Sequence, residues 1–313
     1  MALFSKKTRK KITTAVAAAV LIFCLVIELG QRVPGLGIPS WDELFANADL
    51  SSTHVIPEGE LQVCFIDVGN ADSILIRQGE ANALIDAGER GDGDDVLAYL
   101  NAQGVKKLDL VIATHPHADH IGGMADVIDG IPVDKFVMSF MPEDETPTTA
   151  TYLDMLEALD EKNVPVEEAV PGMTYTLGTA QLTVLAPLAP SDEANNLSVV
   201  TRLTFGKRRF LFMGDAETDV EKLLLSSDAS LSADVIKVGH HGSDTSSSQT
   251  FLARVNPAYA VIPCGKGNSY GHPHEETLTR LSKMGVGVYR SDVNGHIAFT
   301  TDGDDYLSVS TQY

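Results

Sequence analysis

The sequence predicts an α+β protein in which two β-sheets form a sandwich covered by helices, preceded by an N-terminal transmembrane anchor. Three observations support this prediction. Hydrophobic residues make up 44% of the 313-residue chain, which is ample for a packed core. Downstream of residue 60, short apolar runs typical of strands form two groups, each accompanied by helical patterns. A long uncharged run follows a basic cluster close to the first residue.

We predict that residues 1–29 form a cytoplasmic basic cluster and a transmembrane signal anchor. Five basic residues lie between Lys6 and Lys11, and an uncharged run follows from Ile12 to Ile27. This run is just under the ~20 residues of a full span, so its length also suits a cleaved signal peptide, which would leave a secreted protein. We favour the anchor because no small-x-small cleavage motif follows promptly. By the positive-inside rule, the chain after residue 29 then lies outside the cytoplasm.

We predict that residues 30–59 form a linker and that residues 60–313 form the folded domain. The linker is rich in proline, glycine and serine. The chain carries a formal net charge of −20, which argues against tight, charge-driven binding of nucleic acid. Its three cysteines, Cys24, Cys64 and Cys264, lie in separate apolar runs, so we expect no disulfide framework.

Within the domain, strands and helices alternate in two halves. In the first half, hydrophobic periodicity predicts strands at 61–68, 73–77, 83–86, 108–114, 135–139, 174–177 and 181–185, with helices at 94–103, from 121 and at 149–162. In the second half it predicts strands at 197–205, 209–213, 233–238 and 258–263, helices at 216–225, 247–255 and 274–284, and terminal strands. This succession predicts the helix-covered sandwich.

The densest group of candidate metal ligands lies in residues 114–120, which read Thr-His-Pro-His-Ala-Asp-His. An apolar strand ends where this group begins, and strand ends are where α/β proteins build their sites. Residues two apart on an extended segment project to the same side, so His115 and His117 can reach one ion. The following turn delivers Asp119 and His120 to a neighbouring ion. Imidazole and carboxylate ligands suit Zn²⁺, Mn²⁺ or Fe, and we expect one or two divalent ions, Zn²⁺ or Mn²⁺.

The pattern His-x-His-x-Asp-His, followed by Ile-Gly-Gly-Met at 121–124, resembles the signature of the metallo-β-lactamase superfamily. The resemblance implies that family's αββα sandwich and a metal-dependent hydrolase. It also implies ligands at two later strand ends: Asp215, between the two ions, and one residue of the pair His240 and His241. We favour His241 as the ligand, with His240 supporting a ligand or facing the substrate. The reverse assignment stays open.

Three runs make the chain similar to the ComEC/Rec2-like branch, which is linked to DNA uptake in competence: 65–76, 238–243 and 268–274. The resemblance covers the hydrolase domain only and implies no transport role, because the many-helix channel of full-length ComEC proteins has no counterpart here. One departure from the superfamily pattern is that no histidine lies between His120 and His240. The third imidazole expected beside His115 and His117 is therefore missing, and an Asn-Asn-Leu-Ser segment at 195–198, similar to the branch, occupies its stretch.

Other polar residues are expected to support the ligands or to contact substrate. Asp67 and Asp86 lie at strand ends and are expected to orient ligands or turns, with Asp72 a weaker candidate of the same kind. His272 is the candidate proton donor, and His274, just before a helix, is also consistent with capping it. The remaining candidates are Asn195, Asn196, Ser198, Ser243, Asn268 and Tyr270, of which Asn268 fits a turn equally well.

These residues predict metal-assisted hydrolysis, in which bound ions activate water and Asp119 and His272 are the catalytic side chains. The resemblance favours a nucleic-acid or small-molecule phosphodiester as substrate. Two alternatives remain. One is a hydrolase of a lactone, a phosphocholine ester, a β-lactam or another small ester on the same metal centre. The other is a non-catalytic binding protein of a competence or envelope complex, whose protein partners are unknown.

Overall fold

The computed structural model describes residues 56, 59–139, 141 and 146–313. The predicted anchor at 1–29 lies outside these residues, as does nearly all of the predicted linker at 30–59. Among the residues described, no helix combines the length and the hydrophobicity needed to cross a membrane. The first strand of the described domain, β1, begins at Leu61.

One sheet contains eight strands in the order β15-β14-β1-β2-β3-β4-β5-β6. Neighbouring strands pair antiparallel from β15 to β3 and parallel from β3 to β6. The strands are Leu61–Phe65 (β1), Ile74–Gln78 (β2), Ala81–Ile85 (β3), Leu110–Ala113 (β4), Phe136–Met138 (β5), Val166–Glu168 (β6), Ile297–Thr301 (β14) and Leu307–Thr311 (β15). The last two strands of the chain therefore return to pair beside the first.

The other sheet contains seven strands in the order β13-β12-β11-β10-β9-β8-β7. Neighbours pair parallel from β13 to β10 and antiparallel from β10 to β7. The strands are Thr174–Leu177 (β7), Ala180–Val184 (β8), Thr201–Phe205 (β9), Arg208–Phe212 (β10), Val235–Lys237 (β11), Tyr259–Ile262 (β12) and Gly287–Arg290 (β13).

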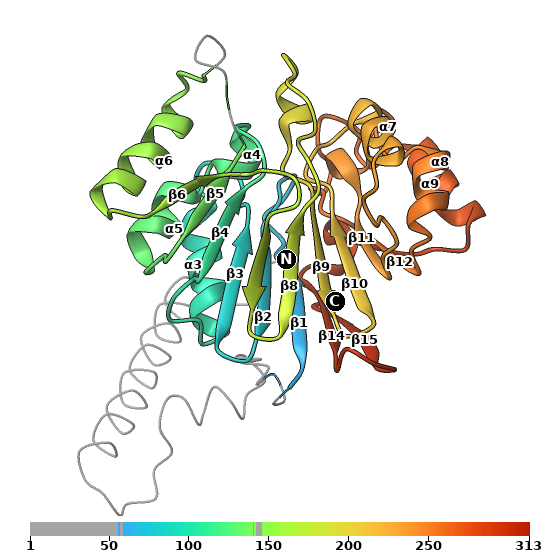
Figure 1. Ribbon diagram of the computed structural model, residues 1–313, viewed down its shortest axis with the longest axis horizontal. Coiled ribbons are helices and arrows are strands. Elements are labelled where there is room, and N and C mark those ends of the chain that lie inside the picture. The colour runs from blue at the N-terminus through green and yellow to red at the C-terminus, as the bar shows by residue number, and fades with distance from the viewer. Residues whose placement is uncertain (1–55, 57–58, 140, 142–145) are drawn as a thin grey trace, which may run out of the picture. The chain divides into compact units, whose positions relative to one another are not determined.

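Helices cover the outer face of each sheet, as Figure 1 shows. The eight-stranded sheet packs against Gly93–Ala102 (α3), Met124–Gly130 (α5) and Ala150–Glu161 (α6). The seven-stranded sheet packs against Thr218–Ser226 (α7), Gln249–Val255 (α8) and Glu275–Lys283 (α9). Shorter turns are Ala118–Ile121 (α4), Ser291–Asn294 (α10), and the 3₁₀ turns Ala194–Leu197 (η1) and Gly239–Gly242 (η2).

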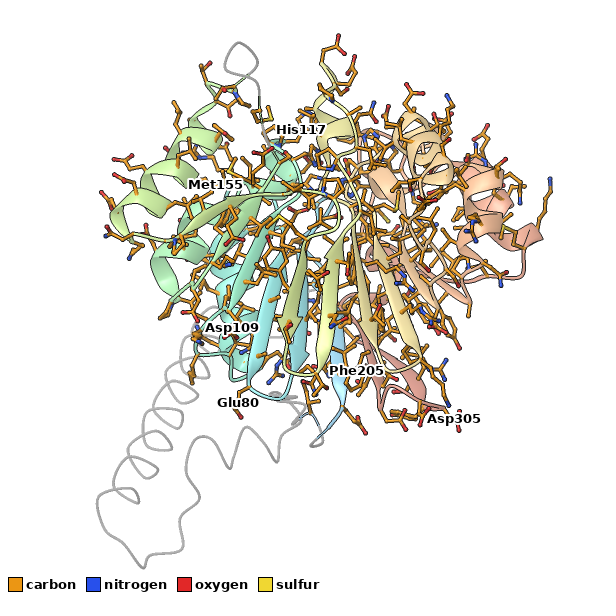
Figure 2. All side chains as sticks on the ribbon, viewed as in Figure 1. Glu80, Asp109, His117, Met155, Phe205 and Asp305 are labelled. Atoms are coloured by element: carbon orange, nitrogen blue, oxygen red, sulfur yellow. The ribbon has the colours of Figure 1, made fainter. Side chains whose placement is uncertain are left out.

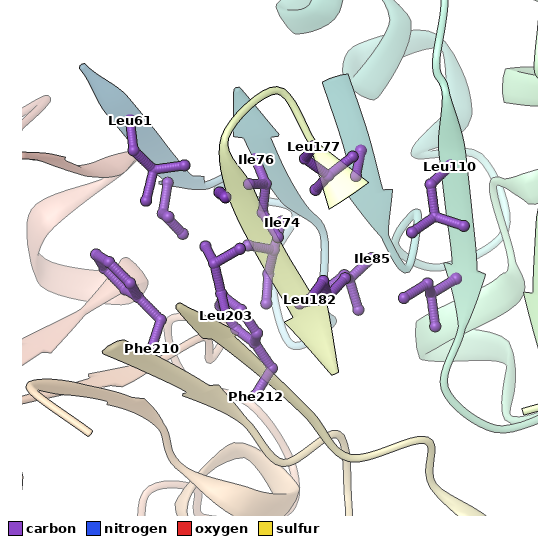
Figure 3. Packing of buried hydrophobic residues seen from close by; sticks show 14 of the residues in the cluster. Leu61, Ile74, Ile76, Ile85, Leu110, Leu177, Leu182, Leu203, Phe210 and Phe212 are labelled. Carbon is purple, nitrogen blue, oxygen red and sulfur yellow. The ribbon is translucent and has the colours of Figure 1, made fainter. Parts of the chain in front are cut away.

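The main core lies between the two sheets. Successive side chains of a strand point to opposite faces, so a strand covered on both faces is buried at every position. In β1, Val63 and Phe65 point into the core between the sheets, whereas Cys64 packs against the helices of its own sheet. Figure 3 shows Leu203 and Phe210 of the second sheet in the same core. Each fully buried side chain of this size contributes ~1.5–3 kcal/mol, which makes the two sheets one cooperative unit.

The predicted helix-covered sandwich is confirmed, with three corrections to its elements. The helix predicted from residue 121 is in fact two short helices, α4 and α5, separated by Gly122 and Gly123. The strand predicted at 197–205 is shorter, because the 3₁₀ turn η1 precedes it and β9 begins only at Thr201. Strand β6 was not predicted, because its Val166 and Glu168 are exposed and give no buried apolar pattern.

Candidate metal centre

The candidate metal centre lies at one end of the sandwich, where strands of both sheets end. Residues 114–120 follow β4 of the eight-stranded sheet, whereas Asp215 and His241 follow β10 and β11 of the seven-stranded sheet. Figure 2 shows His117 at this end of the domain and Glu80 at the opposite end. All three ligand-bearing turns lie at the carboxyl ends of strands that pair parallel with a neighbour, where α/β folds place their sites.

Two glycines allow the loop after β3 to pack against the turn that carries the first ligands. A Cβ atom on Gly122 would lie 2.2 Å from the backbone nitrogen of Arg90. A Cβ on Gly123 would lie 2.3 Å from the carbonyl oxygen of Ala87. Only glycine permits backbones to approach so closely. The backbone N–H of Ala87 then donates to the carbonyl of His120 at 2.8 Å, which fixes this ligand turn against β3.

Four side chains converge on one point: Asp119, His120, Asp215 and His241 each offer a ligand atom within 4.8 Å of the others. His120 Nε2 lies 3.2 Å from Asp215 Oδ1, and His241 Nε2 lies 3.3 Å from Asp119 Oδ2. Both Nε2 atoms are buried and lack a hydrogen-bond partner. Buried imidazole nitrogens are rarely left unpaired, and these face carboxylate oxygens. The donor set therefore fits a divalent ion such as Zn²⁺ or Mn²⁺.

The other ring nitrogen of each histidine is held by a fixed partner. His120 Nδ1 donates to Asp86 Oδ2 at 2.7 Å, and Asp86 also accepts hydrogen bonds from the backbone and side chain of Thr114. His241 Nδ1 donates to the carbonyl of Pro263 at 3.0 Å. This arrangement leaves Nε2 of each ring free to bind an ion, as in many metal sites. Asp86 thus lies where the sequence predicted a residue that orients ligands.

His115 and His117 lie beside the four-ligand group: His115 Nε2 is 3.0 Å from His117 Nδ1, and the ring centroids of His115 and His120 are 4.2 Å apart. Among the described residues, no third histidine, cysteine or carboxylate brings a ligand atom within 4.8 Å of both. His115 is buried, and its other nitrogen lies 3.2 Å from the hydroxyl of Thr114, whereas His117 is exposed. The centre is therefore asymmetric, with one four-ligand group and one pair of imidazoles.

The 195–198 segment supports neighbouring groups through hydrogen bonds. Ser198 Oγ accepts a hydrogen bond from the backbone of Asp215 at 3.0 Å and lies 3.5 Å from His115 Nδ1. Asn195 Nδ2 donates to Glu217 Oε1, and Asn196 Oδ1 accepts from the Glu217 backbone, both at 3.3 Å. The segment therefore holds Asp215 and Glu217 in place.

The two adjacent histidines after β11 point to different partners. Both have left-handed backbone angles, with φ of 47° for His240 and 48° for His241, which is uncommon outside glycine. His241 joins the four-ligand group. His240 Nδ1 instead lies 3.1 Å from Glu217 Oε1, and its Nε2 lies 3.7 Å from Asp215 Oδ2. Glu217 was not singled out from the sequence, although it follows Asp215 by only two residues.

Lys237 is a buried cation at the centre that sequence reasoning missed. Its Nζ lies 2.5 Å from Asp72 Oδ2, 2.7 Å from the carbonyl of Gly214 and 3.4 Å from Asp215 Oδ1. Asp72 is also buried, and its Oδ1 lies 3.5 Å from His241 Nδ1. In the sequence, Lys237 lies within an apolar run that reads as a strand, and a lysine is almost never buried without a partner. This position was the signal that could have revealed a buried ion pair.

Charges within the centre strongly perturb its ionisation. Burial would raise the pKa of Asp215, but His241, His120 and Lys237 hold that pKa well below its usual range. Burial would lower the pKa of His241, but Asp215 and Asp119 raise it to about 9. Without an ion, the carboxylate and this imidazole are thus both charged near neutral pH. An ion that binds here must displace the imidazole proton.

A pocket of about 410 Å³ opens beside the four-ligand group. It is lined by Asn70, Glu89, His117, Ala118, Asp119, Asn195, Asp215, His240, His241, Tyr270 and His272. Burial and the nearby His240 and His241 lower the pKa of His272 to about 4. An imidazole with this pKa is neutral near pH 7, which disfavours the predicted role of His272 as proton donor. Asn70 and Glu89 were not among the predicted pocket residues.

Four predicted residues lie away from the pocket wall and shape the surrounding loops. Asp67 accepts a hydrogen bond from the Gly69 backbone in a turn, and Ser243 Oγ contacts the hydroxyl of Thr245. The Asn268 side chain donates to the carbonyls of Gly265 and His272 and so bridges its own turn, which agrees with the expectation that Asn268 is a turn residue. His274 Nδ1 accepts a hydrogen bond from the backbone of Asp244, and it makes no side-chain cap of α9.

The sequence matches one protein family and is similar to several known proteins. Residues 66–266 match the family described as "Metallo-beta-lactamase superfamily". ComE operon protein 3 of Bacillus subtilis (strain 168) is 33% identical over 265 residues, covering 77% of this chain and 33% of that protein. Competence protein ComA of Neisseria gonorrhoeae is 29% identical over 293 residues, covering 91% of this chain and 39% of that protein. The chain thus spans between a third and two fifths of the length of these relatives.

The solved structures agree at the level of fold. YhfI, a metallo-beta-lactamase fold protein from Bacillus subtilis, matches with a TM-score of 0.52 and 14% identity, covering 77% of this chain and 100% of that chain. The family match contains all four residues of the ligand group described above. The chain therefore belongs to the metallo-β-lactamase superfamily, has its hydrolase fold, and is related to competence proteins of the ComEC/Rec2-like branch.

Proposed function

We propose that this protein is a metal-dependent phosphodiesterase, acting on DNA or on a small phosphodiester, with its domain anchored outside the cytoplasm. One observation carries the proposal: the four-ligand group of Asp119, His120, Asp215 and His241 opens onto a pocket of about 410 Å³. A structural metal site is closed by its ligands, whereas a catalytic site keeps an open position. The matched competence proteins favour a nucleic-acid substrate over other esters.

In this proposal, each part of the centre has a defined task. Asp119, His120, Asp215 and His241 hold one ion, while His115 and His117 bind a second ion or an oxygen of the substrate. When bound, a divalent ion supplies Lewis-acid chemistry, lowering the pKa of water and polarising a phosphoryl oxygen. The protein supplies fixed ligand positions through Asp86 and the Pro263 carbonyl.

Asp119 is the proposed catalytic carboxylate. Both Asp119 and Asp215 line the pocket, but the Asp119 side chain is 30% exposed whereas that of Asp215 is only 3% exposed. Burial would raise the pKa of Asp119, but His241 and His120 hold the pKa below the usual range, so Asp119 stays ionised. An ionised carboxylate on the pocket wall would help to hold an ion and would orient a water molecule beside it.

The test begins with the metal content of the purified protein. The metal-stripped protein is then assayed with Zn²⁺ or Mn²⁺ restored, against bis(p-nitrophenyl) phosphate, single-stranded DNA and a panel of lactones. The proposal expects metal-dependent hydrolysis of the phosphodiesters, abolished by Asp119→Ala but kept by Asp160→Ala, an exposed carboxylate on α6. Turnover of lactones alone would overturn the phosphodiester assignment. Equal activity of Asp119→Ala and the native protein would overturn any catalytic role for this centre.

The location of the domain is a separate part of the proposal, because it depends on residues 1–29. The basic cluster and the uncharged run after it support a single-pass anchor with the domain outside the cytoplasm. Alkaline extraction of membranes and protease treatment of intact spheroplasts test this arrangement. A protein that is released by alkaline extraction, or one that resists external protease until the cells are lysed, would contradict the anchor or its orientation.

A further inference from the structure

Tyr270 is an exposed aromatic ring at the edge of the catalytic pocket. It is 68% exposed, although it lines the same cavity as Asp119 and His241. Large aromatic side chains in solvent make no contribution to the core, so their exposure beside a site suggests contact with a ligand. None of the tasks assigned above to the metal ligands requires this ring.

The loop that carries Tyr270 is held firmly by its own hydrogen bonds. Asn268 Nδ2 donates to the carbonyl of Gly265 at 2.9 Å and to the carbonyl of His272 at 2.6 Å, and Asn268 Oδ1 accepts from the His272 backbone at 3.0 Å. His274 Nε2 lies 3.3 Å from the carbonyl of Tyr270 itself. The exposed ring is therefore presented on a fixed backbone, so little conformational entropy is lost when a ligand packs on it.

Rings are stacked from the pocket edge to the metal ligands. Tyr270 lies nearly parallel to His272, with ring centroids 5.6 Å apart and an interplanar angle of 21°. His272 in turn lies nearly parallel to His241, with centroids 6.2 Å apart and an angle of 21°. The outer face of Tyr270 thus continues a stack that begins at a metal ligand. A planar ring of a ligand packed on this outer face would extend the stack.

The charge of the pocket indicates what kind of contact must provide affinity. The residues that line it include Glu89, Asp119 and Asp215 but neither lysine nor arginine, and the whole chain has a formal net charge of −20. Phosphate contacts normally dominate the affinity of nucleic-acid-binding proteins, and they need basic side chains. No lysine or arginine is among the described residues that line the pocket, so a metal ion held by the four-ligand group would have to provide the contact with phosphate. Stacking on an aromatic ring does not depend on charge and is available to every base.

We propose that Tyr270 is a binding surface for an unpaired nucleobase of the substrate, stacked on its open face. This inference rests on the proposed phosphodiesterase function and names its substrate class: single-stranded nucleic acid or a nucleotide ester. A quaternary ammonium group, as in a phosphocholine ester, is bound by a cage of several aromatic rings. Among the described residues that line the pocket, Tyr270 is the only phenylalanine, tyrosine or tryptophan, which favours a flat ring as the ligand.

The test uses the full-length chain and two chromogenic esters with the same leaving group. Thymidine 5′-(p-nitrophenyl phosphate) carries a base, and methyl p-nitrophenyl phosphate lacks one. The native protein should prefer the thymidine ester in kcat/KM, and Tyr270→Ala should lower that preference about tenfold, while Tyr270→Phe retains it. Tyr306→Ala, at an exposed tyrosine beside β15, is the matched control and should retain the preference.

The outcomes separate this inference from the function on which it rests. Hydrolysis of both esters with no preference for thymidine, or an equal loss on both for Tyr270→Ala, would overturn the stacking role and leave the phosphodiesterase proposal intact. A higher kcat/KM for p-nitrophenyl phosphorylcholine would overturn it as well. Hydrolysis of no phosphodiester would remove both. Binding gives an independent readout: Tyr270→Ala should weaken binding of a thymidine oligonucleotide more than binding of an abasic one.

Discussion

Replacing Lys237 by methionine tests whether the buried cation is required to hold the centre together. Methionine has a similar length and volume, so the change removes the charge without opening a large cavity. Lys237 and its partner Asp72 have side-chain exposures of 0% and 2%. Once the ammonium is gone, the buried Asp72 carboxylate loses its nearest cation and keeps the His241 imidazole 3.5 Å away, and Asp215 loses its neighbour 3.4 Å away.

The expected loss follows from this burial. Removing one partner of a buried ion pair costs about 3–5 kcal/mol, because the remaining charge is left without solvent or partner. We therefore expect Lys237→Met to lower the free energy of unfolding by about 3–5 kcal/mol. Adding Asp72→Asn to it should restore part of that loss, with a coupling energy of about 1–3 kcal/mol between the two positions.

Urea unfolding of the compact unit Val55–Tyr313, followed by circular dichroism, measures these energies. The matched control is Lys222→Met, which breaks an ion pair with Asp219 whose side chains are 72% and 75% exposed. Exposed pairs contribute ~0.5 kcal/mol or less. A loss for Lys237→Met no larger than for this control would refute the view that Lys237 is a required charge.

Three further predictions concern the ligands and their support. Because burial would lower the pKa of His241 but Asp215 and Asp119 raise it to about 9, metal affinity should increase with pH up to that value. Calorimetric titrations that give equal affinities at about pH 6 and pH 8 would contradict this. Asp86→Asn should weaken metal binding about 10- to 100-fold, since Asp86 holds Nδ1 of His120, and an unchanged affinity would show that this contact is dispensable. Gly122→Ala should lower the free energy of unfolding by about 1–3 kcal/mol or more, because its Cβ would lie 2.2 Å from a backbone nitrogen, and an unchanged urea midpoint would refute that close packing.

The first candidate ligands could be located from the sequence because they cluster just after an apolar strand. His115, His117, Asp119 and His120 lie within six residues, so their clustering needs no knowledge of the fold. Asp215 and His241 were expected only from the family resemblance, because a Gly-Asp step or a histidine pair after a strand is also typical of an ordinary turn or loop. Local order along the chain was therefore enough to locate residues 115–120, but not the other two.

Contacts between distant segments could not be predicted in the same way. Asp72 lies just before β2 begins, and Lys237 is the last residue of β11. They meet only because these two strands lie in different sheets that face each other across the core. Asn70 reaches the pocket for the same reason. Such pairs depend on how the two sheets pack, which hydrophobic periodicity in one strand does not report.

An apolar run in the sequence indicates which residues are buried more reliably than it indicates which residues pair in a sheet. Val199 and Val200 are fully buried and extend the apolar run before β9, so residues 197–205 were predicted as one strand. In the structure, the Val199 N–H donates to the carbonyl of Thr114, which follows β4, and Val200 exchanges backbone hydrogen bonds with Leu185 and Ala186, which follow β8. Both side chains are buried, yet neither residue belongs to β9.

The division of the ligand group between two sheets has a consequence for when activity can appear. Asp119 and His120 follow β4, whereas Asp215 and His241 follow β10 and β11, so one ion would join segments separated by roughly 120 residues, as a reversible cross-link does. A fragment that ends before β10 lacks half of the ligands. Under the function and location proposed above, such a centre stays inert in the nascent chain until both halves have been exported and have docked.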